Sequence, residues 1–226
     1  MAAFDARGYH PRDELTYVTY GVPGREMSRL AMRDDRTMLL AVFRDAYLPR
    51  DAPPGGPSTD AKRRAVLRSI FGGLGWECDR VLAAMDAAPE VYFDRVSQIR
   101  LPRWTPGRTA LVGDAAACVS LLAGEGTGLA MAEAYGLAAE LAAHAGDHAA
   151  AFAAYERRLA PFLSGKQRSA ARFASSFAPK SALGIWFRNV VTRLMRFRPV
   201  ADWFVTRDPR DDIALPEVPR ESGGAA

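Results

Sequence analysis

The feature that most constrains this chain is a run of small residues between a short apolar segment and a long Ala-rich segment. Ala110–Val112 is wholly apolar, as expected of a strand buried on both faces. Gly113 and Asp114 follow at once. Three alternating glycines, at 124, 126 and 128, then open the segment 125–144, which is rich in Ala and Leu. The sequence therefore predicts a buried strand, a loop of small residues and a helix that packs closely on the strand.

This arrangement is suited to binding a ligand. Ligands bind at the ends of strands in open sheets, and glycines at a helix start let the backbone approach them closely. The unpaired N–H groups of a helix start favour an electron-rich or anionic partner, and a carboxylate can accept hydrogen bonds from sugar-like hydroxyls. The candidate residues are Gly113, Asp114, Gly124, Gly126, Thr127 and Gly128. Close helix packing and simple capping explain the same residues equally well, so the pattern alone leaves both interpretations open.

The residues before this segment predict an antiparallel sheet with two helices. Short runs that favour strands are separated by turn sequences rich in Gly, Pro and Asp, and two segments have helical spacing of apolar residues. The predicted strands are 15–20, 27–32, 38–43 and 90–101, and the predicted helices are 61–71 and 76–87. In the long strand, Val91 and Phe93 are expected on one side and Tyr92 on the other.

The residues after this segment predict a helical end. Helices are expected over 149–163, 166–177 and 181–197, followed by a frayed tail over 209–226. Between Arg157 and Ala201 there are ten Lys or Arg residues and no Asp or Glu, although the net charge of the whole chain is only +4. This basic stretch is either a solvated helix face or a surface that attracts an anionic partner. The last helix is amphipathic, and either covers a core or contacts a membrane surface.

Other patterns exclude several classes of protein. Cys78 and Cys118 lie in unrelated contexts, so they predict neither a disulfide framework nor a zinc knuckle. His144 and His148 are interpreted as surface residues because no third metal ligand is evident, and no metal site is predicted. The first residues lack the basic-then-apolar order of a signal peptide, so a cytoplasmic location is expected. Nucleic-acid binding is not expected.

The central segment resembles a known family. Leu111-Val112-Gly113-Asp114-Ala115-Ala116, followed by Gly124-x-Gly126 and an Ala-rich helix, is similar to the second FAD-binding motif of the group A flavoprotein monooxygenases, the aromatic hydroxylase-like family. A longer match runs from Gln98 to Leu141, and the downstream segments 155–159 and 211–216 also resemble one bacterial branch of that family. The upstream strands resemble the substrate-domain sheet of the family, so the resemblance extends over nearly the whole chain.

The resemblance implies a fold and an activity. The fold would be α+β, with a partial antiparallel substrate-domain sheet, a remnant of the FAD-binding α/β domain and a helical carboxy-terminal end. The resemblance implies four parts. Residues 1–101 would form the substrate-domain sheet with two helices, and residues 102–164 the carboxy-terminal part of the FAD-binding domain. Residues 165–208 would form the carboxy-terminal helices, and residues 209–226 the tail. The implied activity is oxidation of a small organic substrate, aromatic compounds among them, with FAD, NAD(P)H and oxygen. The substrate pocket would lie between the sheet and the flavin, within reach of strand residues such as Tyr92 and Phe93.

The resemblance also assigns roles to the candidate residues. Asp114 would hydrogen-bond the ribityl chain of FAD. Gly124, Gly126, Thr127 and Gly128 would bring helix-start N–H groups to the N1–C2 carbonyl edge of the flavin. No catalytic side chain is assigned, because the cofactor supplies the chemistry.

One feature of the family is absent from the sequence. Family members begin with a strand, a G-x-G-x-x-G turn and a helix that hold the ADP half of FAD, and this sequence contains no such turn. We therefore expect an amino-terminally truncated form that binds FAD weakly, with a separate chain as one source of the missing half. The alternative is a non-catalytic interaction protein that uses its basic carboxy-terminal helices.

Overall fold

The computed structural model describes residues 1–9, 16–50, 52–53, 56–120, 123–197 and 215. These residues form two compact units. The first contains residues 1–95 and 175–194, and the second contains residues 96–174 together with the chain from 195 onward. The mixed α+β fold predicted from the sequence is confirmed by an antiparallel sheet in the first unit and by helices in both.

The sheet of the first unit has five strands in the order β2-β3-β4-β1-β5. They are β1 (Ala2–Arg7), β2 (Tyr17–Val22), β3 (Arg25–Ala31), β4 (Arg36–Phe43) and β5 (Tyr92–Phe93). All neighbouring strands are antiparallel, and the predicted meander forms β2, β3 and β4. β1 was not among the predicted strands, and it shows the alternating burial expected of a strand with one face on the core.

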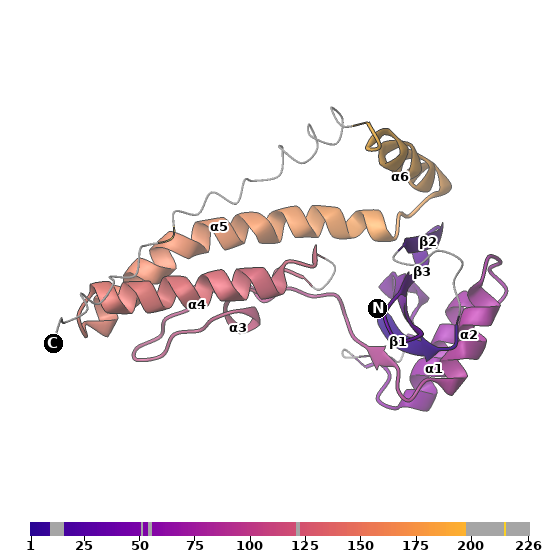
Figure 1. Ribbon diagram of the computed structural model, residues 1–226, viewed down its shortest axis with the longest axis horizontal. Coiled ribbons are helices and arrows are strands. Elements are labelled where there is room, and N and C mark those ends of the chain that lie inside the picture. The colour runs from indigo at the N-terminus through magenta and orange to yellow at the C-terminus, as the bar shows by residue number, and fades with distance from the viewer. Residues whose placement is uncertain (10–15, 51, 54–55, 121–122, 198–214, 216–226) are drawn as a thin grey trace. The chain divides into compact units, whose positions relative to one another are not determined.

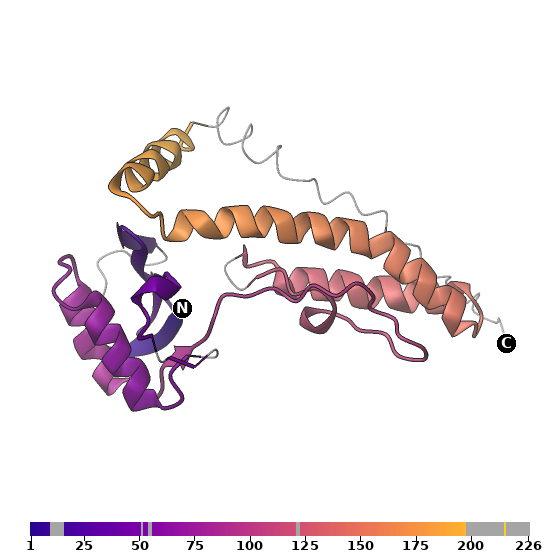
Figure 2. The ribbon, with the colours of Figure 1, turned by 180° about the vertical axis from the view of Figure 1, so that it is seen from behind.

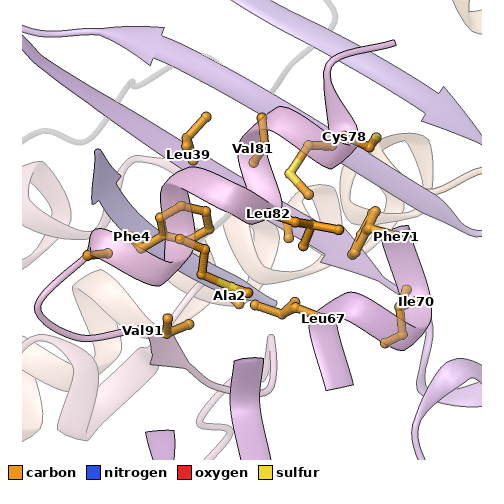
Figure 3. Close-up of a cluster of buried hydrophobic side chains, with 14 of the residues drawn as sticks. Ala2, Phe4, Leu39, Leu67, Ile70, Phe71, Cys78, Val81, Leu82 and Val91 are labelled. Carbon is orange, nitrogen blue, oxygen red and sulfur yellow. The ribbon is translucent and has the colours of Figure 1, made fainter. Parts of the chain in front are cut away.

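Two helices cover one face of this sheet (Figure 1). They are α1 (Asp60–Phe71), whose Thr59 side chain accepts a hydrogen bond from the Lys62 amide, and α2 (Cys78–Ala87). Both match predicted helices. Figure 3 shows their apolar side chains meeting those of the sheet in one core. The labelled members are Ala2, Phe4, Leu39, Leu67, Ile70, Phe71, Cys78, Val81, Leu82 and Val91.

The predicted long strand over 90–101 is wrong, because only Tyr92 and Phe93 pair with β1. The predicted sides are correct: Val91 and Phe93 are buried, whereas Tyr92 is 49% exposed. After Asp94 the described chain offers this segment no neighbouring strand. Instead, the Gln98 side chain donates to the Val119 and Gln167 carbonyls, and the Ile99 carbonyl accepts from the Gln167 side chain.

The rest of the first unit is helical. A short 3-10 helix covers Asp45–Tyr47, and α6 covers Ala182–Leu194 and contacts β2. The side chain of Arg188 on α6 binds the buried carboxylate of Glu26 on β3. No residue of α6 is buried, and its outward apolar side chains Leu183, Trp186 and Phe187 are exposed. Within the described residues, α6 therefore does not cover a core with these side chains.

The second unit is built on two long helices, α4 (Gly126–Ala143) and α5 (His148–Phe177), of which α5 belongs to this unit as far as residue 174. Figures 1 and 2 both show them side by side. The two helices predicted over 149–163 and 166–177 form one helix despite Pro161. Buried Tyr155, Leu159 and Leu163 recur every four residues, so one continuous face packs against α4.

The apolar run before the Gly-Asp pair is not a strand, which corrects the prediction for Ala110–Val112. No strand of the described residues pairs with it, and its three residues are only half-buried. The Leu111 amide donates to the Trp104 carbonyl (2.9 Å), and the Leu111 carbonyl accepts from the Tyr155 hydroxyl (3.0 Å). The predicted tail over 209–226 lies outside the described residues except for Leu215. No described helix is long and apolar enough to cross a membrane.

Candidate functional site

The Gly-Asp turn begins at a residue that only glycine suits. Gly113 has φ 66° and ψ −140° and precedes the short helix α3 (Asp114–Ala117). A Cβ atom on Gly113 would lie 3.3 Å from the Cβ of Ala130 on α4. The positive φ strains any larger residue, and a Cβ atom would also press on Ala130, so the turn lies directly against the first turns of α4.

The turn brings Asp114 to the start of α4. The Asp114 side chain is exposed, and its Oδ1 lies 3.8 Å from the position that a Cβ atom would take on Gly126. Gly124 has φ +70° just before the helix, and the space beside Gly124 and Gly128 is open. Thr127 is exposed on the same first turn. The two ends of the predicted motif, separated in sequence, therefore meet at one exposed surface.

The start of α4 has no side-chain cap among the described residues. Glu125 occupies the N-cap position and its side chain makes no capping hydrogen bond. The first helical bond of α4 runs from the Leu129 amide to the Glu125 carbonyl. The amides of the first turn have no acceptor within the helix, and they carry the positive end of the helix dipole. This surface can receive an electron-rich group.

A buried carboxylate that the sequence analysis missed supports the turn. Glu133 on α4 is 1% exposed, and its Oε2 accepts hydrogen bonds from the Gly113 amide (2.6 Å) and the Tyr155 hydroxyl (3.4 Å). Burial raises the pKa of Glu133, the two hydrogen bonds act in the opposite direction, and the charge of Asp114 adds to the increase. Burial, together with Glu133, also holds the pKa of Tyr155 above its usual range.

A sequence signal for this carboxylate did exist. Glu133 and Glu140 are the acidic residues within the Ala-rich helix, and their spacing of seven places both on one face. Both are buried, and Glu140 accepts from the Arg158 guanidinium on α5 (2.8 Å). The acidic face of α4 is thus its inner face, the reverse of the usual expectation for charged residues.

Two glutamine side chains hold the loop between α3 and α4. The Gln98 amide group donates to the carbonyls of Val119 (2.5 Å) and Gln167 (2.8 Å). The Gln167 amide group donates to the carbonyls of Ile99 (2.6 Å) and Cys118 (3.1 Å). Each side chain satisfies two backbone acceptors, so the loop after Asp114 is joined both to the 98–99 segment and to α5.

Lys166 holds the other end of this loop. Its ammonium lies 3.3 Å from Oε2 and 3.4 Å from Oε1 of Glu125, the residue that precedes α4. Lys166 belongs to the basic stretch that the sequence analysis read as a solvated face or an anion-attracting surface. It is buried and paired, and so is not part of an open basic surface.

Three other residues named from the sequence, Cys118, Tyr92 and Phe93, are described by their own surroundings. Cys118 is half-buried, and burial together with the charge of Asp114 raises the pKa of its thiol, so the thiol is not activated. Phe93 belongs to the core of the first unit, whereas Tyr92 lies on the opposite face and donates to Asp94 (3.0 Å). Among the described residues no cluster of His, Cys, Asp or Glu is suited to hold a metal.

Known proteins are similar to this chain over the same residues. The family described as FAD binding domain matches residues 85–164, which include the whole Gly-Asp turn and α4. A flavin-dependent monooxygenase from an unknown prokaryotic organism is 36% identical over 146 residues, covering 65% of this chain and 36% of the relative. The FAD-dependent monooxygenase asL4 of Sarocladium schorii is 31% identical over 219 residues, covering 87% of this chain and 50% of the relative.

A solved structure has a fold similar to that of this chain. The tetracycline destructase Tet(55) is 30% identical, with a TM-score of 0.73 over 96% of this chain and 54% of the destructase. The match to the FAD binding domain family covers the residues of the candidate site. The chain belongs to the family of FAD-dependent monooxygenases. It spans about a third to a half of the length of the curated relatives it matches.

The residues at the site suit FAD. Its ribityl chain carries hydroxyls that an exposed carboxylate such as Asp114 can bind, and the uncapped start of α4 lies beside that carboxylate. Glycines at 124, 126 and 128 leave room for a flat ring to approach the backbone. Apart from the adjacent backbone, the nearest described atom to their Cβ positions is Asp114 Oδ1, 3.8 Å from that of Gly126.

Proposed function

We propose that this chain contributes the flavin-ring side of the cofactor site in an FAD-dependent monooxygenase. The enzyme would act on a small organic substrate, aromatic compounds among them, with NAD(P)H and oxygen. The observation that carries this proposal is the placement of the exposed Asp114 carboxylate beside Gly126, at a helix start without a side-chain cap. The names of the relatives as flavin-dependent monooxygenases support the same activity.

In this proposal the chain itself binds and orients. Asp114 accepts hydrogen bonds from the ribityl hydroxyls, and the first-turn amides of α4 donate to the carbonyl edge of the flavin. The helix dipole there favours negative charge on that edge. Bound FAD supplies the electron transfer and oxygen chemistry. Lys166, Gln98 and Gln167 act indirectly, by holding the loop that places these groups.

The diphosphate of FAD requires residues outside this set. A G-x-G-x-x-G turn is absent from the 226 residues, so we propose that another segment binds the ADP half. That segment lies either on the same polypeptide or on a separate chain, and it would dock on the second unit.

The test measures flavin binding and NAD(P)H oxidation by this chain combined with the dinucleotide-binding segment of a relative. We expect Asp114→Ala to weaken FAD binding about 10-fold or more, because a buried ligand hydroxyl then lacks its acceptor. Asp147→Ala is the matched control, since Asp147 is an aspartate at a helix start, that of α5, where it accepts from the Ala150 amide.

Two results would contradict the proposal. One is equal FAD affinity of the two aspartate variants. The other is steeply salt-dependent binding to anionic vesicles by a combined protein that binds no flavin, which would support an interaction protein with basic helices instead.

A further inference from the structure

The carboxylate of Glu133 contacts the Gly-Asp turn through a backbone amide. Its Oε2 receives the Gly113 amide at 2.6 Å, and Gly113 is the residue directly before Asp114. The Tyr155 hydroxyl shares its single proton between this oxygen, at 3.4 Å, and the Leu111 carbonyl, at 3.0 Å. One buried oxygen atom therefore connects the turn, α4 and α5.

The turn needs such a partner. Gly113 has a positive φ and an extended ψ, a conformation outside regular helix and strand, so no secondary structure fixes its amide. The segment before it pairs with no described strand. A hydrogen bond to a charged acceptor is stronger than one to a neutral group, and Glu133 is the acceptor that the Gly113 amide finds.

We infer that Glu133 is a positioning residue for Asp114: by holding the Gly113 amide, its buried carboxylate fixes the turn that places Asp114 at the start of α4. Glu133 does not contact the cofactor in this scheme. Its consequence for FAD rests on the proposed function, whereas its effect on the turn does not. Tyr155 contributes from the other side by keeping the carboxylate in place.

The experiment compares three variants of the full chain. Glu133→Met keeps the size of the side chain and removes both acceptors. Glu133→Gln keeps one oxygen that can accept the Gly113 amide. Glu140→Met is the matched control, because Glu140 is a buried glutamate on the same face of the same helix, with its own partner on α5.

The primary measurement is hydrogen exchange of the Gly113 amide and of the following amides through Ala117, without cofactor. We expect Glu133→Met to speed exchange of the Gly113 amide about 10-fold or more relative to the parent chain. Glu133→Gln should restore most of the protection, and Glu140→Met should leave Gly113 unchanged while lowering thermal stability. Tyr155→Phe should give a smaller increase at Gly113, and it replaces Glu133→Met as the decisive variant if the latter does not fold.

The outcomes separate this inference from the proposed function. Unchanged exchange at Gly113 in Glu133→Met, or an equal effect from Glu140→Met, overturns the positioning role. A second measurement is FAD affinity in the combined protein, where Glu133→Met should weaken binding and Glu133→Gln should largely restore it. Faster exchange at Gly113 with no flavin binding by the parent would uphold the positioning role and reject the flavin site.

Discussion

Glu26 on β3 and Glu133 on α4 are buried carboxylates, and each has partners that compensate for the loss of water. Glu26 binds the Arg188 guanidinium and accepts from the Ser28 hydroxyl, and Glu133 has an amide and a hydroxyl. Burial is the largest influence on both, and it raises the pKa of both groups. Each glutamate thus makes stability depend on pH and on its partners.

The sign of this pH dependence follows from the direction of the shift. Because the pKa of Glu26 is higher in the folded chain, its contribution is fully present below the ordinary pKa of glutamate and is lost as pH rises through the raised value. We expect Glu26→Gln to flatten the dependence of stability on pH above about pH 4. Urea unfolding midpoints across the acid range would measure this dependence of stability on pH. Glu90→Gln, at an exposed position, is the control, and equal slopes for Glu26→Gln and the parent would contradict the expectation.

Removal of Arg188 leaves the Glu26 carboxylate buried without its charged partner. We expect Arg188→Met to lower the free energy of unfolding by about 3–5 kcal/mol, the usual effect of breaking a buried ion pair. The double variant with Glu26→Gln should recover most of that loss, because no buried charge remains. A double-mutant cycle by chemical denaturation measures the coupling, and additive effects of the two changes would contradict it.

At the scale of elements, helices with apolar periodicity were predictable and isolated strands were not. The spacing of Val66, Leu67, Ile70 and Phe71 identifies α1, and these side chains are all buried. Ala110–Val112 has the composition of a buried strand but no described strand beside it. Strand formation depends on a distant partner, which local sequence does not specify.

In the candidate site, too, some residues could be predicted from local sequence and others could not. The Gly-Asp turn and the glycines before α4 could be identified from sequence because each residue has a local conformational role. Glu133 had a partial signal in its spacing of seven residues from Glu140 on one face of α4, but its bond to the Gly113 amide, 20 residues away, could not be predicted. Gln167 had no local signal, because the Ile99 carbonyl that it binds is 68 residues away.

The packing of α4 on α5 depends on a glycine. A Cβ on Gly136 would lie 3.1 Å from Cδ1 of Leu159, closer than ordinary contact. We expect Gly136→Leu to force the helices apart and to lower the free energy of unfolding by about 1–3 kcal/mol. Gly165→Leu is the control, because the nearest contact that a Cβ there would meet among the described residues, apart from the adjacent helix backbone, is the end of the Arg168 side chain, 3.9 Å away. Thermal unfolding of both variants measures the difference, and a loss in Gly165→Leu as large as in Gly136→Leu would refute the packing argument.

At the scale of the whole molecule, the two units have separate hydrophobic clusters. The cluster around Leu67 draws only on the first unit, and the cluster around Leu163 draws only on the second. We expect Leu67→Ala and Leu163→Ala each to cost about 2–5 kcal/mol, with the loss confined to the unit that holds the residue. Hydrogen exchange read out element by element measures this. Equal loosening of α1 and α4 in either variant would show that the units unfold together.

Cofactor affinity is a property of the whole molecule, because the chain spans only part of the length of its relatives. The residues placed at the site address the ribityl chain and the ring, and none of them is assigned to the diphosphate. We therefore expect the 226-residue chain alone to purify with little flavin. It should also bind riboflavin and FAD with affinities within about threefold of each other, since FAD gains nothing from its ADP half. Fluorescence titration with both ligands measures the ratio.

Addition of a dinucleotide-binding segment should raise the affinity for FAD relative to the affinity for riboflavin. FAD binding should strengthen by orders of magnitude because two groups of contacts then act on one ligand, whereas riboflavin binding should change little. Two observations would contradict this account. A yellow chain with stoichiometric FAD, or a preference of the isolated chain for FAD over riboflavin by more than about 10-fold, would show that these residues hold the diphosphate themselves.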